Sequence, residues 1–271
     1  MPRIALAVEY DGSPYHGWQR QSEVDSVQAQ LETALSRVAN EPVVVVCAGR
    51  TDRGVHATYQ VVHFETPVQR ADHAWLMGGT FFLPPDITLL WAQLVPDDFH
   101  ARFSATARSY RYVILNRQTR AALNRERVTW YRAWLDADAM HEAGQHLLGK
   151  HDFSSFRARD CQALSPVRTI ESFSVQRQGD YLYLDITANA FLHHMVRNIV
   201  GTLLPIGTGE QMPESILAVL EARHRSVAGI TAPAEGLYLV NVRYPAHFAV
   251  PPPRSLPVFW SPLGEFPPTS C

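Results

Sequence analysis

The chain has 271 residues, of which 46% are hydrophobic and 18% charged, and its formal net charge is −2. This composition provides enough apolar side chains for one large or two smaller folded units and excludes a chain that is disordered as a whole. Its three cysteines are far apart and odd in number, which argues against a disulfide framework and a cysteine zinc site. No apolar run approaches the ~20 residues of a membrane helix. Because the N-terminus also lacks a signal-peptide pattern, we expect a cytoplasmic protein.

Positive charge is concentrated in one part of the sequence. Of the 24 basic residues, 23 are arginine and Lys150 is the only lysine. Eight arginines but a single acid, Glu126, fall between Arg102 and Arg132. Codon bias explains the ratio of arginine to lysine, but it does not explain the local excess. Because the planar arginine fork matches phosphate oxygens, the excess predicts a surface that follows a nucleic-acid backbone.

Hydrophobic periodicity predicts alternating strands and helices in the first half of the chain. In chain order these are a strand over 4–10, a helix over 27–38, strands over 43–46 and 60–65, a helix over 71–80 and a strand over 87–94. Asp25 or Ser26 can cap the first helix. The four consecutive valines of 43–46 predict a strand that is buried on both faces.

The second half has a similar order of elements, without a clear sequence repeat. It comprises a strand over 108–115, a helix from Asp136 or Asp138 to 148, a polar loop over 151–165, strands over 169–176 and 181–188, helices over 193–204 and 213–223, and a strand over 237–242. Closely spaced prolines after residue 250 predict a tail without regular structure. We therefore expect an α+β fold with an N-terminal half over 1–105, a C-terminal half over 106–246 and an irregular tail over 247–271.

The segment 47–57 joins the two central strands of the first half and gathers charged side chains at a glycine-flanked turn. These side chains are Arg50, Asp52, Arg53 and His56. Loops held by rigid strands often carry catalytic groups. Aspartate is also common in turns for a structural reason, because it bonds to its own backbone. Spacing alone leaves both interpretations of Asp52 open.

Two further residues attract attention on physical grounds. Arg197 lies in an apolar helix, where a guanidinium is costly to bury without a partner, either a structural acid or a functional carboxylate. Tyr110 alternates in a strand with Tyr112 and Ile114, which share its face, a pattern that is also typical of a core tyrosine. The pair His193 and His194, even with more distant histidines, lacks metal-ligand spacing, so we expect no metal site.

Several blocks of the sequence together resemble the tRNA pseudouridine synthase A (TruA) family. They are YDG at 10–12 with GWQ at 17–19, GRTDRGVHA at 49–57, FHARF at 99–103, ARSYRY at 107–112, DF at 152–153 with SF at 155–156, FLHHMVRNIVG at 191–201 and EGLYL at 235–239. The resemblance extends to about residue 245. The chain departs from it at Ser109, where a second arginine is common, and at Arg53, where a small residue is common. Arg53 beside Asp52 would lower the pKa of that carboxyl.

The resemblance implies a fold and an activity. The fold would consist of two ferredoxin-like halves with mainly antiparallel sheets joined into one long sheet, with helices on one side and a catalytic cleft between the halves. The activity would be isomerisation of uridine to pseudouridine at positions 38–40 of the tRNA anticodon stem-loop. The family acts as a homodimer and uses no cofactor.

The resemblance also implies roles for three residues in the reaction. Asp52 would be the catalytic carboxylate, which either attacks C1′ of the ribose or removes the C2′ proton. Arg197 would pair with Asp52 and keep it ionised. Tyr110 would stack on the target uracil and help to remove the C5 proton.

Further residues would bind the RNA. Arg50 would take the space of the flipped uridine, since a base must leave its stack before the sugar can react. Leu237 would pack against the uracil ring, and Arg70 and Arg102 would contact phosphates. Two other classes stay open: a non-catalytic RNA-binding protein or RNA chaperone that uses the arginines of 102–132, and a hydrolase or nuclease that uses Asp52 and His56.

Overall fold

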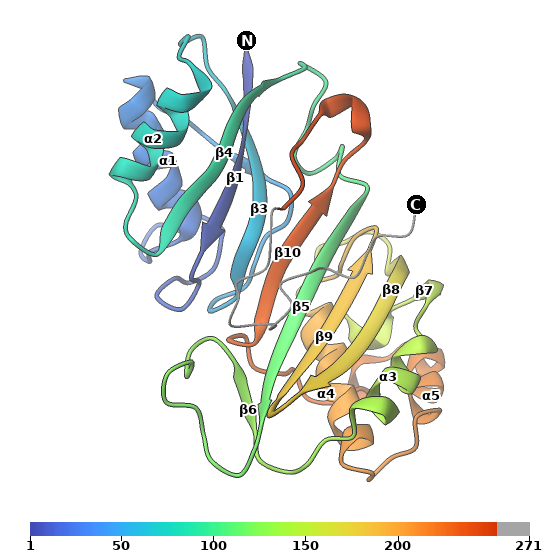
Figure 1. Cartoon of the computed structure of the whole chain (residues 1–271). Helices are drawn as coiled ribbons and strands as arrows, with labels where there is room; N and C mark the ends of the chain where they lie inside the picture. Colours follow the sequence, from blue (N-terminus) through green and yellow to red (C-terminus); the bar gives the residue numbers. More distant parts are fainter. Residues whose placement is uncertain (254–271) are drawn as a thin grey trace. The chain divides into compact units, whose positions relative to one another are not determined.

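The computed structural model describes residues 1–253 of the chain. Within this described part the fold is α+β, with five α-helices and ten β-strands whose pairings are mostly antiparallel. The chain forms two compact units (Figure 1), which are Met1–Thr106 with the described residues from Leu239 onward (unit 1) and Ala107–Tyr238 (unit 2). Among the described residues, no helix combines the length and the apolar character that crossing a membrane requires.

Unit 1 is built around its first strand. Its elements are β1 (Arg3–Tyr10), α1 (Val27–Ala39), β2 (Val46–Cys47), β3 (His56–Glu65), α2 (Asp72–Phe82) and β4 (Ile87–Val95). Strand β1 lies between β3 and β4 and is antiparallel to both. Residues 5–8 of this strand have no exposed surface, which makes it the centre of the core. Figure 1 shows α1 and α2 side by side, and α2 packs against β4.

The helix predicted over 27–38 is confirmed as α1, with the predicted apolar face buried. Leu31 and Leu35, four residues apart, are fully buried. Ser26 rather than Asp25 is the N-cap, because its hydroxyl accepts a hydrogen bond from the backbone of Ala29 (3.3 Å).

The prediction of a strand buried on both faces over 43–46 is wrong. Only Val46 and Cys47 pair with β3, and Val44 is 69% exposed while Val43 and Val45 are buried. Side chains of α1 take the place of a partner strand here. The backbone N–H of Val45 donates to the carboxylate of Glu32 (3.1 Å). The face of the segment that carries Val44 is open to solvent.

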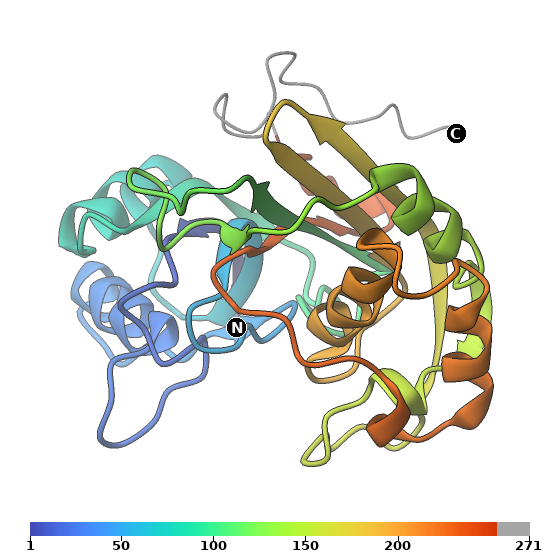
Figure 2. The same ribbon diagram turned by 90° about the horizontal axis from the view of Figure 1, so that it is seen from below.

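The strands of unit 2 pair mostly in antiparallel fashion, and helices pack on them. Its elements are β5 (Ala107–Asn116), β6 (Thr129–Tyr131), α3 (Ala137–Gln145), β7 (Gly149–Asp152), β8 (Val167–Gln178), β9 (Tyr181–Ala188), α4 (Met195–Gly207), α5 (Ser215–Ala222) and the start of β10 (Leu237–Arg243). Strand β9 lies between β5 and β8, β7 follows β8, and β6 runs parallel to β5. Helix α3 packs against β8 and α4 (Figure 2). Strand β10 begins in unit 2 and ends in unit 1, where it neighbours β3.

The polar loop predicted over 151–165 is partly wrong. Its first residues belong to β7, an edge strand of four residues, and the 3₁₀ turn Ser154–Phe156 follows. The three-residue strand β6 was not predicted at all. Both strands are short, and partners distant in sequence determine their pairing. The 3₁₀ turn Ala246–Phe248 overlaps the start of the tail predicted over 247–271, and residues 254–271 lie outside the described part.

Two arginines of the predicted phosphate surface are core residues. Arg111 makes a two-pronged contact with the carboxylate of Asp185 (both bonds 2.7 Å) and is 5% exposed. Arg108 is 9% exposed and donates to the carbonyl of Asn189 (3.0 Å). Both lie on β5, which is covered on both faces along most of its length. Any such surface is therefore formed by the other arginines of 102–132.

Candidate active site

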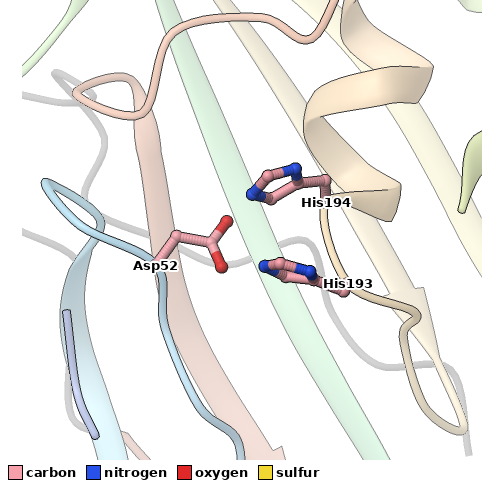
Figure 3. Close-up of side chains that lie close together, drawn as sticks. All are labelled: Asp52, His193 and His194. Atoms are coloured by element: carbon pink, nitrogen blue, oxygen red, sulfur yellow. The ribbon is translucent and has the colours of Figure 1, made fainter. Parts of the chain in front are cut away.

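Asp52 lies on the loop between β2 and β3 of unit 1, and it is half-buried. Figure 3 shows its side chain projecting from this loop, and it shows His193 and His194 on the turn that leads into α4 of unit 2. The loop closes on itself because the backbone N–H of Val55 donates to the carbonyl of Asp52 (3.1 Å). Gly54 has a φ of 75°, a conformation that glycine adopts without strain.

Two glycines from the beginning of the chain allow the backbone to approach this loop closely. A Cβ atom added to Gly12 would lie 2.0 Å from the carbonyl oxygen of Val55. At Gly17, whose φ is 95°, an added Cβ would lie 2.8 Å from the carbonyl oxygen of Thr51 and 3.1 Å from the carbonyl carbon of Asp52. The loop that carries Asp52 is thus packed directly against the backbone of another segment.

Hydrogen bonds hold the loop just before Asp52, at Thr51 and Gly49. The hydroxyls of Tyr10 and Thr51 are 2.8 Å apart in a buried position, and the backbone N–H of Trp18 donates to the carbonyl of Thr51 (3.0 Å). On the β2 side, the buried amide of Gln60 donates to the carbonyl of Gly49 (2.5 Å) and accepts from its N–H (3.3 Å). The position of the Asp52 backbone is therefore set by side chains of β1 and β3.

A buried polar pair supports the far end of the loop. Nδ1 of His56, a residue that is 2% exposed, lies 3.1 Å from the carboxylate of Asp11 and 3.0 Å from the backbone nitrogen of Gly12. Burial by itself would raise the pKa of Asp11, but hydrogen bonds from His56 and Ser13 outweigh it and hold that pKa well below its usual range. Asp11 is thus a carboxylate that fixes the start of β3.

In unit 2, Arg197 occupies the first turn of α4 and is half-buried. Its Nε donates to the carbonyl of Ala232 (2.8 Å), and its own carbonyl accepts from the N–H of Ala232 (3.1 Å). A guanidinium near a helix N-terminus is unfavourable to the helix dipole, so its position favours a nearby anion.

Tyr110 and Leu237 also belong to unit 2. Tyr110 lies on β5, is 8% exposed and meets the ring of Phe191 edge to face, with the centroids 4.9 Å apart. Leu237, at the first position of β10, is 6% exposed. It follows Gly236, whose carbonyl accepts from the N–H of Val113 (2.8 Å) and where an added Cβ would lie 2.7 Å from the hydroxyl of Thr129.

The remaining predicted site residues belong to unit 1 and lie on its surface. Arg50 and Arg70 are exposed, as is Arg53. Arg102 is exposed too, and its guanidinium lies over the ring of Phe103, 5.5 Å from the centroid. Exposed arginines can reach a phosphate without first breaking a buried contact.

The histidines that the sequence raised as possible metal ligands each contact other groups of the protein. His56 belongs to the buried pair with Asp11, and Nε2 of His151 contacts the carbonyl of Leu148 (2.7 Å). Nδ1 of His193 lies 3.2 Å from the carboxylate of Asp160. The neighbouring rings of His193 and His194 are 4.0 Å apart between centroids.

Sequence reasoning assigned no role to the residues that position the Asp52 loop. Tyr10, Thr51 and Gln60 are single polar residues within or beside apolar strands, and periodicity treats each as an ordinary core position. The blocks at 10–12 and 17–19 gave the only signal, because two glycines so close to a strand end indicate a close backbone approach.

Comparison with known proteins covers most of the chain. A family described as tRNA pseudouridine synthase matches residues 6–104 and 143–245. The chain is 58% identical over 257 residues to the tRNA pseudouridine synthase A of Shewanella woodyi, which covers 95% of this chain and 98% of that protein. It is 59% identical over 249 residues to the protein of the same name from Vibrio parahaemolyticus, covering 92% and 94%. The corresponding protein of Nitrosococcus oceani is also 59% identical, with 92% and 96% covered. The chain therefore belongs to the tRNA pseudouridine synthase A (TruA) family, as the sequence blocks predicted.

Proposed function

We propose that this protein isomerises uridine to pseudouridine at positions 38–40 of the tRNA anticodon stem-loop, with Asp52 as its catalytic carboxylate. The observation that carries the proposal is a half-buried carboxylate on a loop that hydrogen bonds hold just before it, in a chain that is 58% identical to a named tRNA pseudouridine synthase A. An enzyme must hold its reacting group within a few tenths of an ångström, and this loop is built in that way.

The reaction replaces one bond to the uracil ring by another. The bond between C1′ and N1 breaks, a bond between C1′ and C5 forms, C5 loses a proton and N1 takes one up, so that the atoms balance and no net oxidation or reduction occurs. Asp52 serves this reaction either by attacking C1′ or by removing the proton from C2′. The uridine leaves its stack before the ribose meets the carboxylate.

Arg197 and Tyr110 complete the reaction centre in this proposal. Arg197 pairs with Asp52 and keeps it ionised, which is supported by the cost of a half-buried guanidinium at the start of an apolar helix. Tyr110 stacks on the uracil and helps to remove the C5 proton. Its ring is held in place by Phe191 and offers an aromatic face of the kind on which bases stack.

The binding roles belong to four other residues. Leu237 packs against the uracil ring, and Arg50 takes the space from which the uridine has flipped. Arg70 and Arg102 contact phosphates, consistent with their exposure. Arg53, which is exposed beside Asp52, lowers the pKa of that carboxyl.

The proposal includes an arrangement of the chain. The halves over 1–105 and 106–246 are ferredoxin-like, join into one long sheet with helices on one side, and form the catalytic cleft between them. The order of elements in unit 1 and the division of β10 between the units support this arrangement. Two copies form a homodimer that binds tRNA as its partner, in the cytoplasm and without a cofactor.

The test is the release of tritium from C5-labelled uridine in unmodified tRNA, without added metal or cofactor. The wild-type protein is expected to release it, and Asp52→Asn is expected to lower turnover at least about 100-fold while tRNA binding is kept. Asp98→Asn, at an exposed position of the same unit, is the matched control and should behave as wild type.

The rival classes predict other outcomes of the same experiment. A folded wild-type protein that binds tRNA but releases no tritium would be an RNA-binding protein or chaperone, and the proposal would fall. Cleavage of the RNA that stops with a chelator would instead indicate a metal-dependent nuclease.

A further inference from the structure

Unit 2 contains a pocket of about 490 Å³ at the start of α4. Its wall consists of residues 158–160 after the 3₁₀ turn Ser154–Phe156, of His194 and Asn198 at the start of the helix, and of residues between 225 and 231. None of the residues to which the proposed reaction assigns a role lines this pocket. Its size is typical of sites that bind a small molecule or one unit of a larger ligand.

A partly buried hydrogen-bond network fixes one side of the pocket. Nη1 of Arg225 donates to the carbonyls of Ala228 (3.3 Å) and Gly229 (2.9 Å). Its Nη2 donates to the amide oxygen of Asn198 (3.0 Å) and to the hydroxyl of Thr231 (3.1 Å). Asn198 has no exposed surface, so the network joins the helix to the segment that crosses it.

Close backbone packing makes this wall rigid as well. A Cβ added to Gly201 would lie 1.7 Å from the carbonyl oxygen of Ile230, and one added to Gly229 would lie 2.3 Å from the carbonyl oxygen of Gly201. The N–H of Gly229 also donates to the hydroxyl of Thr202 (3.0 Å). The pocket is therefore formed before any ligand enters it.

The charges at the pocket favour an anion. Arg225 is half-buried, its bonds all go to neutral acceptors, and no carboxylate within the described residues pairs with it. Burial lowers the pKa of this guanidinium, which reflects the cost of a charge without a counter-charge. The exposed Arg159 supplies a second guanidinium at the rim, whereas the carboxylate of Asp160 is engaged with His193.

We propose that this pocket binds a backbone phosphate of the RNA substrate, outside the nucleotide that is isomerised. The inference rests on the proposed function, because a polyanionic substrate longer than its target needs contacts away from the reacting base. Arg159, which lines the pocket, contacts the phosphate oxygens. Arg225 provides fixed positive charge from behind, since its N–H groups are already used within the wall.

Arg159→Ala tests the proposal, because this exposed side chain has no bond within the described part of the chain that folding would lose. Binding of fluorescein-labelled tRNA is measured by anisotropy over a range of salt concentrations. Loss of one phosphate contact is expected to weaken binding about 3–10-fold and to reduce the slope of log K against log[salt] by about 1. Arg159→Lys should keep the wild-type salt slope, and turnover at saturating tRNA should be unchanged in both variants.

Arg37→Ala is the matched control, an exposed arginine on α1 of the other unit. The proposal is overturned if Arg159→Ala binds tRNA with wild-type affinity and salt slope, or if Arg37→Ala loses as much. Uridine monophosphate, followed through the Nε resonance of Arg159, distinguishes a free nucleotide from RNA. Binding of that nucleotide with tRNA affinity unaffected by the substitution would assign the pocket to a small anion instead. Failure of the proposed reaction would be seen separately, as wild-type protein that releases no tritium.

Discussion

The hydroxyl of Tyr10 offers a direct test of whether the loop around Asp52 must be held in place. Tyr10→Phe removes only this hydroxyl and keeps the ring, whose centroid lies 5.9 Å from that of Trp18. The change takes from Thr51, the residue before Asp52, a hydroxyl partner at 2.8 Å. Both residues are buried, at 2% and 7% exposure, so bulk water does not replace the bond.

The size of the effect follows from that burial. Loss of one partner of a buried hydrogen bond costs about 1–3 kcal/mol, less than the stability of a typical domain, so the variant should fold. If about 1.4 kcal/mol of this cost falls on the transition state, in which Asp52 must hold its working position, the reaction slows about tenfold. We therefore expect turnover in the tritium-release assay to fall about tenfold, while the affinity for tRNA stays unchanged.

Tyr59→Phe is the control for a general loss of stability. Tyr59 is also a buried tyrosine of unit 1, and its hydroxyl accepts from the indole of Trp91 (3.1 Å) and donates to the carbonyl of Pro251. Urea unfolding should show a similar loss for both variants, with turnover reduced only by Tyr10→Phe. The reasoning is refuted if Tyr10→Phe keeps wild-type turnover despite its lower stability, or if Tyr59→Phe loses turnover equally.

Two further predictions concern stability. Gly12→Ala places a Cβ 2.0 Å from the carbonyl oxygen of Val55, so we expect this variant to lose several kcal/mol of unfolding free energy in urea. Gly179→Ala is the control and should lose only about 1 kcal/mol, because nothing lies within 4 Å of its added Cβ and only the positive φ is unfavourable. Equal losses in the two variants would show that the close approach at Gly12 is not needed. Burial, aided by the charges of His100 and Arg3, lowers the pKa of His63 to about 4. The unfolded chain, in which this pKa is about 6.5, therefore takes up the proton first, and unfolding free energy should fall by at most about 3 kcal/mol as the pH drops from about 6.5 to about 4. His63→Asn, which can keep an acceptor for the N–H of Ala101, should flatten this dependence in urea titrations at pH 7 and 5, and an unchanged slope would contradict the assignment.

Long elements with a clear hydrophobic period were predictable from the sequence. Strands β1, β5 and β9 and helix α1 lie where alternation or helical spacing placed them, within a few residues at their ends. These elements can be predicted because the alternation of apolar and polar residues within each short segment sets which of its side chains are buried. The valine run of 43–46 failed for the opposite reason, since its backbone bonds are made by side chains of α1 rather than by strands on both sides.

The sequence by itself determined the α+β class, the main elements and, through its motif blocks, the family and the choice of Asp52. Only the tertiary structure decided what holds Asp52, because the supporting groups of Tyr10, Gly12 and Gln60 are between 8 and 42 residues away along the chain and meet the loop through the pairing of strands. It also decided that Arg111 serves the core while Arg159 lies at the rim of a pocket. The sequence does not distinguish these two arginines, because only the folded chain determines whether a guanidinium pairs with a carboxylate or faces solvent.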